Sequence, residues 1–372
     1  MSRPRKIWRV GWRLGVGVVL LGWIFHAIFV NEGRLALRRQ GLDWDRLGRA
    51  QQWSAAWSHG PRELWATLNL VGPMAFAVSV VWMGATVALG VIRWRMVLAV
   101  QGLNLPLSRA TEISLVAQFF NSFLLGSSGG DLMKAYYAAR ETHHKKAEAV
   151  VTVLVDRLLG LFAMLLFAGV MMGFNRSLLA QQARLGALAA VILAMLAGCA
   201  LVVGLAFWGG LSRCWPGARQ RLRRLPKGEL LERALESCRQ FGRRPGFLLK
   251  VLGISMVLNG ACVLQILTLA RGLGLGMSGW ALLLIVPAII CIAALPITPS
   301  GLGVRENLYV LLLAAPPIGV EPTKALSLSL LAYAGSLLWS LVGGVVYLTF
   351  KETHHLAEVS RPETVAEELE GP

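Results

Sequence analysis

Long apolar stretches recur along the chain, and they constrain its fold more than any other feature. A transmembrane helix needs about 20 consecutive apolar residues to cross the hydrocarbon core of a bilayer. Charged residues make up only 15% of the sequence, too few to coat the surface of a soluble protein of this length. The sequence therefore predicts an all-α, polytopic helical membrane protein. Its six predicted full spans are residues 10–30, 71–92, 150–173, 187–208, 247–270 and 324–350.

Two further apolar stretches are too short to cross a bilayer as straight helices. They occupy residues 113–126 and 281–295, and each runs into a segment rich in Gly or Pro and then into a second, partly apolar piece. We interpret both as re-entrant hairpins, in which a half-helix enters the membrane, breaks at depth and returns. Non-helical backbone at membrane depth is tolerated only where it is buried in protein or lines a cavity. The two breaks are therefore candidate sites.

The distribution of basic residues predicts the orientation. Segments on one side of this topology hold 25 of the 37 Lys and Arg residues, and segments on the other side hold 10. Because basic residues accumulate in cytoplasmic loops, we expect both termini to lie in the cytoplasm and the protein to lie in the plasma (inner) membrane. The net charge of +17 then faces anionic lipid headgroups, and no nucleic-acid partner is expected.

This topology also predicts an inverted repeat. The two hairpins enter from opposite sides, each within a half of the chain that runs opposite to the other, which is typical of transporters with a binding site between the halves. The alternative is that Gly and Pro are simply common in membrane helices. We expect residues 1–350 to form a single membrane domain, with an external interfacial segment at 31–70 and a basic cytoplasmic amphipathic segment at 213–246. Residues 351–372 form an acidic cytoplasmic tail that we expect to be disordered.

The first break carries polar residues where apolar ones would be expected. Its two glycines permit a tight turn, and Asp131 is a good N-cap for a helix that ends near Arg140. Free backbone N–H groups and Lys134 at the start of that helix would attract an anion. A capped cytoplasmic helix after a turn explains the pattern equally well. The candidate site residues here are Asn121, Gly129, Gly130, Asp131, Lys134, Tyr136 and Arg140.

Asp156 and Arg157 lie inside the predicted span 150–173. Adjacent residues of a helix point about 100° apart, so these two side chains cannot pair face to face. Each needs a partner on another helix, because an unpaired charge in a bilayer is costly. A structural network of ion pairs and a direct contact with substrate are both open.

The second break repeats the chemical layout of the first. Glycines, a helix start, a cation and an acid follow one another at Gly301, Gly303, Arg305 and Glu306. We expect Lys134 and Arg305 to form one cationic pocket for a phosphate-bearing lipid headgroup, with apolar walls for the lipid chains. The sequence has no Walker motif, GxSxG or HExxH, and it indicates no metal site, cofactor or catalytic residue.

In these residues the chain resembles the transmembrane-region family of lysylphosphatidylglycerol synthases, which are flippase-like integral membrane proteins. The resemblance implies that the membrane region translocates a lipid, while a separate soluble domain of the full-length synthases transfers an aminoacyl group from tRNA. Lys134 stands where many relatives carry Arg. The matching motifs are Phe119-Phe120-Asn121, Gly129-Gly130-Asp131 with Lys134, Val155-Asp156-Arg157 and Pro299-Ser300-Gly301 with Arg305-Glu306.

Two functions are therefore open. The first is a lipid translocase for an anionic lipid, such as an aminoacylated phospholipid, a glycolipid or a polyprenyl-phosphate lipid. The alternative is a membrane-embedded or accessory component of a lipid-modifying transferase, working with a separately encoded enzyme. Because 22 residues follow the last predicted span, we expect no transferase domain in this chain and favour transport over enzymatic activity.

Overall fold

The helices of this protein are seen in a computed structural model. It describes residues 22–23, 25–26, 28–30, 32–34, 36–37, 44–123, 129–141, 146–181, 183–208, 238–295, 298 and 301–349. All regular elements in these residues are helical, so the predicted all-α fold is confirmed. Five of the described helices are long and apolar enough to cross a membrane: α3 (Pro73–Val100), α6 (Lys146–Phe174), α8 (Ala183–Trp208), α12 (Pro245–Gly272) and α15 (Pro322–Thr349).

Three predicted segments lie largely or wholly outside the described residues. They are the first span at 10–30, the basic segment at 213–246 and the acidic tail at 351–372. The predicted external segment contains η1 (Trp44–Arg46) and the amphipathic helix α2 (Arg49–Asn69).

Helix α3 is longer than the sequence analysis predicted. The apolar stretch was expected to end at Ile92, with Arg93 in a cytoplasmic segment, but the helix continues to Val100. Its 28 residues are about 42 Å long at 1.5 Å per residue, which places Arg93 about 10 Å inside the helix end. An arginine is tolerated at this position because it has a buried carboxylate partner, described below.

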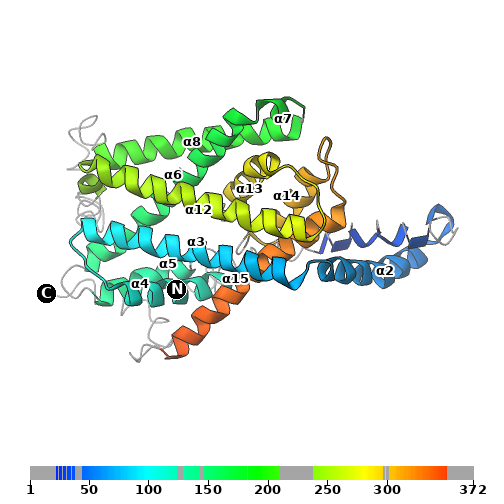
Figure 1. The fold of residues 1–372 in the computed structure, drawn as a ribbon, viewed down its shortest axis with the longest axis horizontal. Coiled ribbons are helices and arrows are strands. Elements are labelled where there is room, and N and C mark those ends of the chain that lie inside the picture. The colour runs from blue at the N-terminus through cyan, green and yellow to red at the C-terminus, as the bar shows by residue number, and fades with distance from the viewer. Residues whose placement is uncertain are drawn as a thin grey trace, which may run out of the picture.

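The long helices run side by side, and Figure 1 shows that the short ones enter the bundle from its two ends. The pair α4 (Leu107–Phe123) and α5 (Gly129–Glu141) enters from the end where α3 stops and α12 begins. The pair α13 (Gly279–Ala293) and α14 (Val304–Leu313) enters from the opposite end, where α7 (Arg176–Gln181) also lies. Two helix pairs from opposite ends are what the hairpin interpretation requires, and their depth in a bilayer stays a prediction.

Helix contacts repeat between the two halves of the chain. We call α3 to α6 the first half and α12 to α15 the second half. In the first half α6 packs on α3 and α5, and in the second α15 packs on α12 and α14. Between the halves, α4 of the first packs on α15 of the second. In the same way, α13 of the second half packs on α6 of the first. Helices α3 and α12 also pack directly on each other. These repeated contacts are the ones that an inverted repeat would make, and the inverted repeat itself stays a prediction.

The contact between α4 and α15 is unusually close. A Cβ added at Gly343 of α15 would lie 2.0 Å from the carbonyl oxygen of Leu115 in α4, so only glycine fits there. Farther along, the hydroxyls of Ser122 and Ser340 are 2.6 Å apart. We call this contact the glycine seam. It joins a hairpin of the first half to the last helix of the second.

Candidate functional site

A buried ionic cluster lies where helices of the first half meet. Asp156 of α6 accepts a hydrogen bond from Arg93 Nε of α3 at 2.8 Å, and its other oxygen is 3.5 Å from Lys134 Nζ of α5. The three side chains are only 10–13% exposed. Arg93 also donates to the hydroxyl of Ser255 in α12 at 3.3 Å. We call Arg93, Lys134 and Asp156 the Asp156 cluster.

The Asp156 cluster holds two cations and one carboxylate, so its formal charge is +1. Space for the Arg93 guanidinium comes from Gly160, where a Cβ would lie 2.9 Å from its nitrogens. Lys134 Nζ lies 4.2 Å from the ring centroid of Trp94, a contact that partly stabilises the ammonium. The Trp94 indole N–H is itself buried and has no hydrogen-bond partner in the described part of the chain. The excess positive charge of the Asp156 cluster favours an anionic ligand.

The neighbouring Arg157 pairs with Asp131 of α5. This pair is more exposed, at 45% for the Arg157 side chain and 30% for that of Asp131. Both Asp156 and Arg157 therefore have partners on other helices, as the sequence predicts.

The start of α5 corrects two expectations. The helix begins at Gly129, so Asp131 lies inside the first turn and is not the N-cap. Asn121 of α4 takes that role, because its side-chain oxygen accepts from the Gly130 N–H at 2.9 Å. Gly130 lies within the helix and has no positive φ. Gly130 is instead required by packing, since a Cβ there would lie 2.0 Å from the Ala117 carbonyl oxygen.

The remaining candidates on α5 lie toward its end. Arg140 donates to the hydroxyl of Tyr136 at 3.0 Å. One residue farther along the chain, Glu141 accepts from Arg109 of α4 at 2.7 Å. This bond holds the outer ends of α4 and α5 together.

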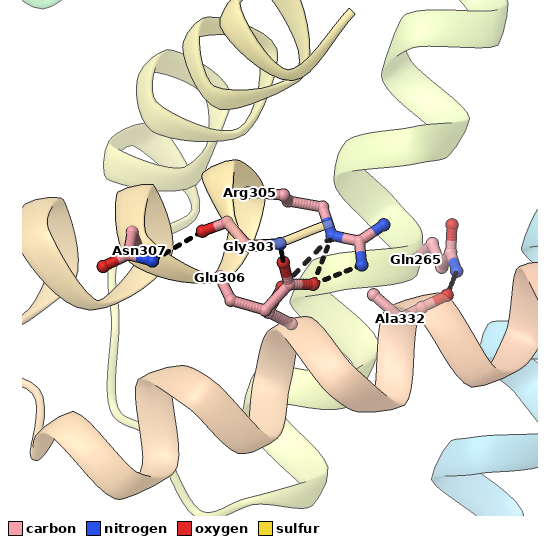
Figure 2. A network of polar contacts seen from close by, with 7 residues as sticks. Gln265, Gly303, Arg305, Glu306, Asn307 and Ala332 are labelled. Carbon is pink, nitrogen blue, oxygen red and sulfur yellow. Dashed lines mark hydrogen bonds and ion pairs between the residues drawn. The ribbon is translucent and has the colours of Figure 1, made fainter. Parts of the chain in front are cut away.

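The second break has a different chemistry, shown in Figure 2. Glu306 is fully buried and accepts from the Gly303 N–H at 2.7 Å, which caps the start of α14. It also pairs with Arg305, whose Nε lies 3.1 Å from the carboxylate. Gly301 and Gly303 have φ values of +70° and +80°, so glycine is needed at both for the turn.

Arg305 is bound on several sides. Its Nε lies 3.3 Å from the Ser329 hydroxyl of α15, and its guanidinium lies 4.6 Å from the ring centroid of Tyr333. We call Gly303, Arg305, Glu306 and Ser329 the Glu306 cluster. One cation and one carboxylate make it formally neutral, and both charges serve to hold the start of α14 on α15.

The structure does not bring Lys134 and Arg305 together. Asp156 lies about 15 Å from the start of α6, and Ser329 lies about 10 Å from the start of α15 at the opposite end of the bundle, at 1.5 Å per residue. The two cations thus belong to separate clusters at different depths. Arg93, which the sequence analysis left out of the site, takes the second cationic position beside Lys134.

The comparison with protein families gives one match. The model of the lysylphosphatidylglycerol synthase TM region matches residues 50–344, which include every helix of both halves except the last residues of α15. A search of curated proteins gives no match. Together with the membrane-length helices, this match makes the protein a multi-pass membrane protein of lipid metabolism or transport. The chain belongs to the lysylphosphatidylglycerol synthase transmembrane-region family.

Proposed function

We propose that this protein is a flippase that moves lipids with a phosphate-bearing, anionic headgroup between the leaflets of the plasma membrane, with both termini in the cytoplasm. The observation that carries the proposal is the Asp156 cluster, which has two cations for one carboxylate among membrane-length helices. A buried charge without a counter-ion is costly in a bilayer. A lipid phosphate would supply the missing negative charge.

The geometry of the cluster suits exchange of partners. Arg93 presents a planar fork of donors that matches a phosphate, and Lys134 adds a compact charge on the other side of Asp156. When the site is empty, Asp156 holds both cations. When a phosphate enters, it shares them with Asp156, so that no cation is left buried without a partner.

The other candidate residues have supporting roles in this proposal. Asp131 and Arg157 form a more exposed pair on the same helices as Lys134 and Asp156, and in this proposal they assist entry of the headgroup. Asn121 and Gly130 hold the start of α5, and with it Lys134, while Gly129 is the first residue of that helix. Tyr136 and Arg140 continue along the same helix.

The Glu306 cluster has a positioning role in the same proposal. Gly301, Gly303, Arg305 and Glu306 fix the start of α14 against α15 in the second half. Exposure of the headgroup to one side and then the other would come from rocking of the two halves, while the lipid chains stay in the bilayer.

A reconstituted assay tests the function. Purified protein is placed in liposomes with fluorescent phosphatidylglycerol or phosphatidylcholine, and a membrane-impermeant reductant reports how fast the labelled lipid reaches the outer leaflet. We expect phosphatidylglycerol to cross faster with protein than without it, and Lys134→Gln to abolish the gain while Lys134→Arg keeps it. Lys324→Gln, at an exposed pair with Glu321, is the matched control and should transport normally. Equal rates with and without protein would refute the proposal.

A further inference from the structure

The two halves share a helix register. Arg93 comes twenty residues after Pro73, the first residue of α3, and Gln265 comes twenty residues after Pro245, the first residue of α12. Both helices have 28 residues and begin with proline. Arg93 and Gln265 therefore occupy the same position in the two halves.

Their partners correspond as well. Asp156 lies on α6, which packs on α3, and Ala332 lies on α15, which packs on α12. Arg93 donates to the Asp156 carboxylate at 2.8 Å, and Gln265 Nε2 donates to the Ala332 carbonyl oxygen at 3.5 Å (Figure 2). One contact is thus made twice, once in each half.

The chemistry of the two contacts differs. The first is ionic and has Lys134 as a second cation, which gives the formal charge of +1. The second joins an amide to a backbone carbonyl, and the nearby Arg305 is already balanced by Glu306. Trp94, with its unsatisfied indole N–H, corresponds to Ile266, which has no donor. Of these two contacts, the first carries an excess positive charge and the second carries none.

The two contacts also lie at different depths. Arg93 is about 10 Å from the end of α3, and Gln265 is about 10 Å from the end of α12, which is at the opposite end of the bundle. Since each helix is about 42 Å long, the two layers are about 20 Å apart. A single headgroup phosphate cannot contact both.

We infer that the protein has one anion site, in the first half, and that the matching position of the second half is a neutral counterpart with little affinity for phosphate. This inference rests on the proposed function and adds to it the side of the membrane on which the headgroup binds. The headgroup is held near the end of the bundle where α3 stops, about 10 Å from that end along α3. With the orientation that the basic residues predict, the binding side is the cytoplasmic leaflet.

Counting bound lipid tests the inference without any transport step. The intact protein is analysed by native mass spectrometry with phosphatidylglycerol, and with phosphatidylcholine as the measure of non-specific binding. We expect one phosphatidylglycerol above that level. The variant Arg93→Gln should weaken this binding by about tenfold or more. It places in the first half the glutamine that the second half carries at position 265, and it leaves Lys134 paired with Asp156. Arg93→Lys should restore much of the binding, and the matched variant Gln265→Leu should leave it unchanged.

Other results of these experiments would contradict either the single anion site or the flippase proposal. The inference would be overturned if Gln265→Leu lost phosphatidylglycerol binding while Arg93→Gln kept it. Two equivalent bound lipids per protein would overturn it as well. A parallel arm with inorganic phosphate separates a lipid site from a site for the free ion: thermal stabilisation by phosphate without bound lipid would also overturn it. The expected binding pattern in a protein that does not move lipid in liposomes would instead sink the flippase proposal and leave the single anion site in place.

Discussion

Replacing Asp156 by Asn should destabilise the protein strongly. The substitution keeps the size of the side chain but removes the one negative charge that holds Arg93 at 2.8 Å and Lys134 at 3.5 Å. Both cations are at most 13% exposed, so water cannot take over the role of the carboxylate. Removing one member of a buried ion pair typically costs about 3–5 kcal/mol of unfolding free energy. We expect a loss in this range for Asp156→Asn.

The measurement is an SDS titration of the detergent-solubilised protein, together with its melting temperature. Glu112→Gln is the matched control, since Glu112 pairs with Arg109 at 2.9 Å but is 40% exposed, and exposed pairs contribute about 0–1 kcal/mol. Asp156→Asn combined with Arg93→Gln should be less unstable than the sum of the two single changes, because only one cation is then left without a partner. A free energy for Asp156→Asn equal to that of the control would refute the ionic reading of the cluster.

Three further predictions follow from the fold. The variants Asn104→Cys and Glu321→Cys should react with an impermeant maleimide from opposite sides of the membrane. Labelling of both from the same side would contradict the placement of these positions at opposite ends of the helix bundle. Gly303→Ala should lower the unfolding free energy by about 1–2 kcal/mol because of its positive φ, whereas Gly276→Ala, at an open position, should change the melting temperature little. Gly343→Ala should cost about 1–3 kcal/mol by forcing α15 away from α4, and a melting temperature equal to that of Gly276→Ala would show that the glycine seam is not tight.

Apolar length and the cost of buried charge made much of the fold predictable. Apolar length predicts five of the six spans and the two short helix pairs. The cost of buried charge predicts that Asp156 and Arg157 need partners on other helices. Arg93 was missed because it directly follows an apolar run, where a basic residue usually marks the membrane boundary. Its place inside α3 depends on Asp156, which lies 63 residues away in sequence.

Local rules failed where a neighbouring helix supplied a better partner. Asp131 has the chemistry of an N-cap, but Asn121 from the preceding helix caps α5 and leaves Asp131 for Arg157. The two glycine breaks look alike in sequence, yet Lys134 and Arg305 join clusters at different depths. A short motif predicts the chemistry of a helix start, but it does not predict where along the bundle axis that helix starts.

The packing of α2 on the first turns of α15 has a mechanical consequence. Leu326 of α15 is fully buried among side chains of α2 and the segment before it, and Thr323 donates a hydrogen bond to the buried Glu32. Trp53 and Trp57 of α2 are exposed, and indoles seated at a membrane interface resist displacement along the bilayer normal. We therefore expect this contact to hold the first turns of α15 at the membrane interface. If the two halves rock as proposed, the second half would turn about this held end, and sliding of α15 along its own axis would be opposed.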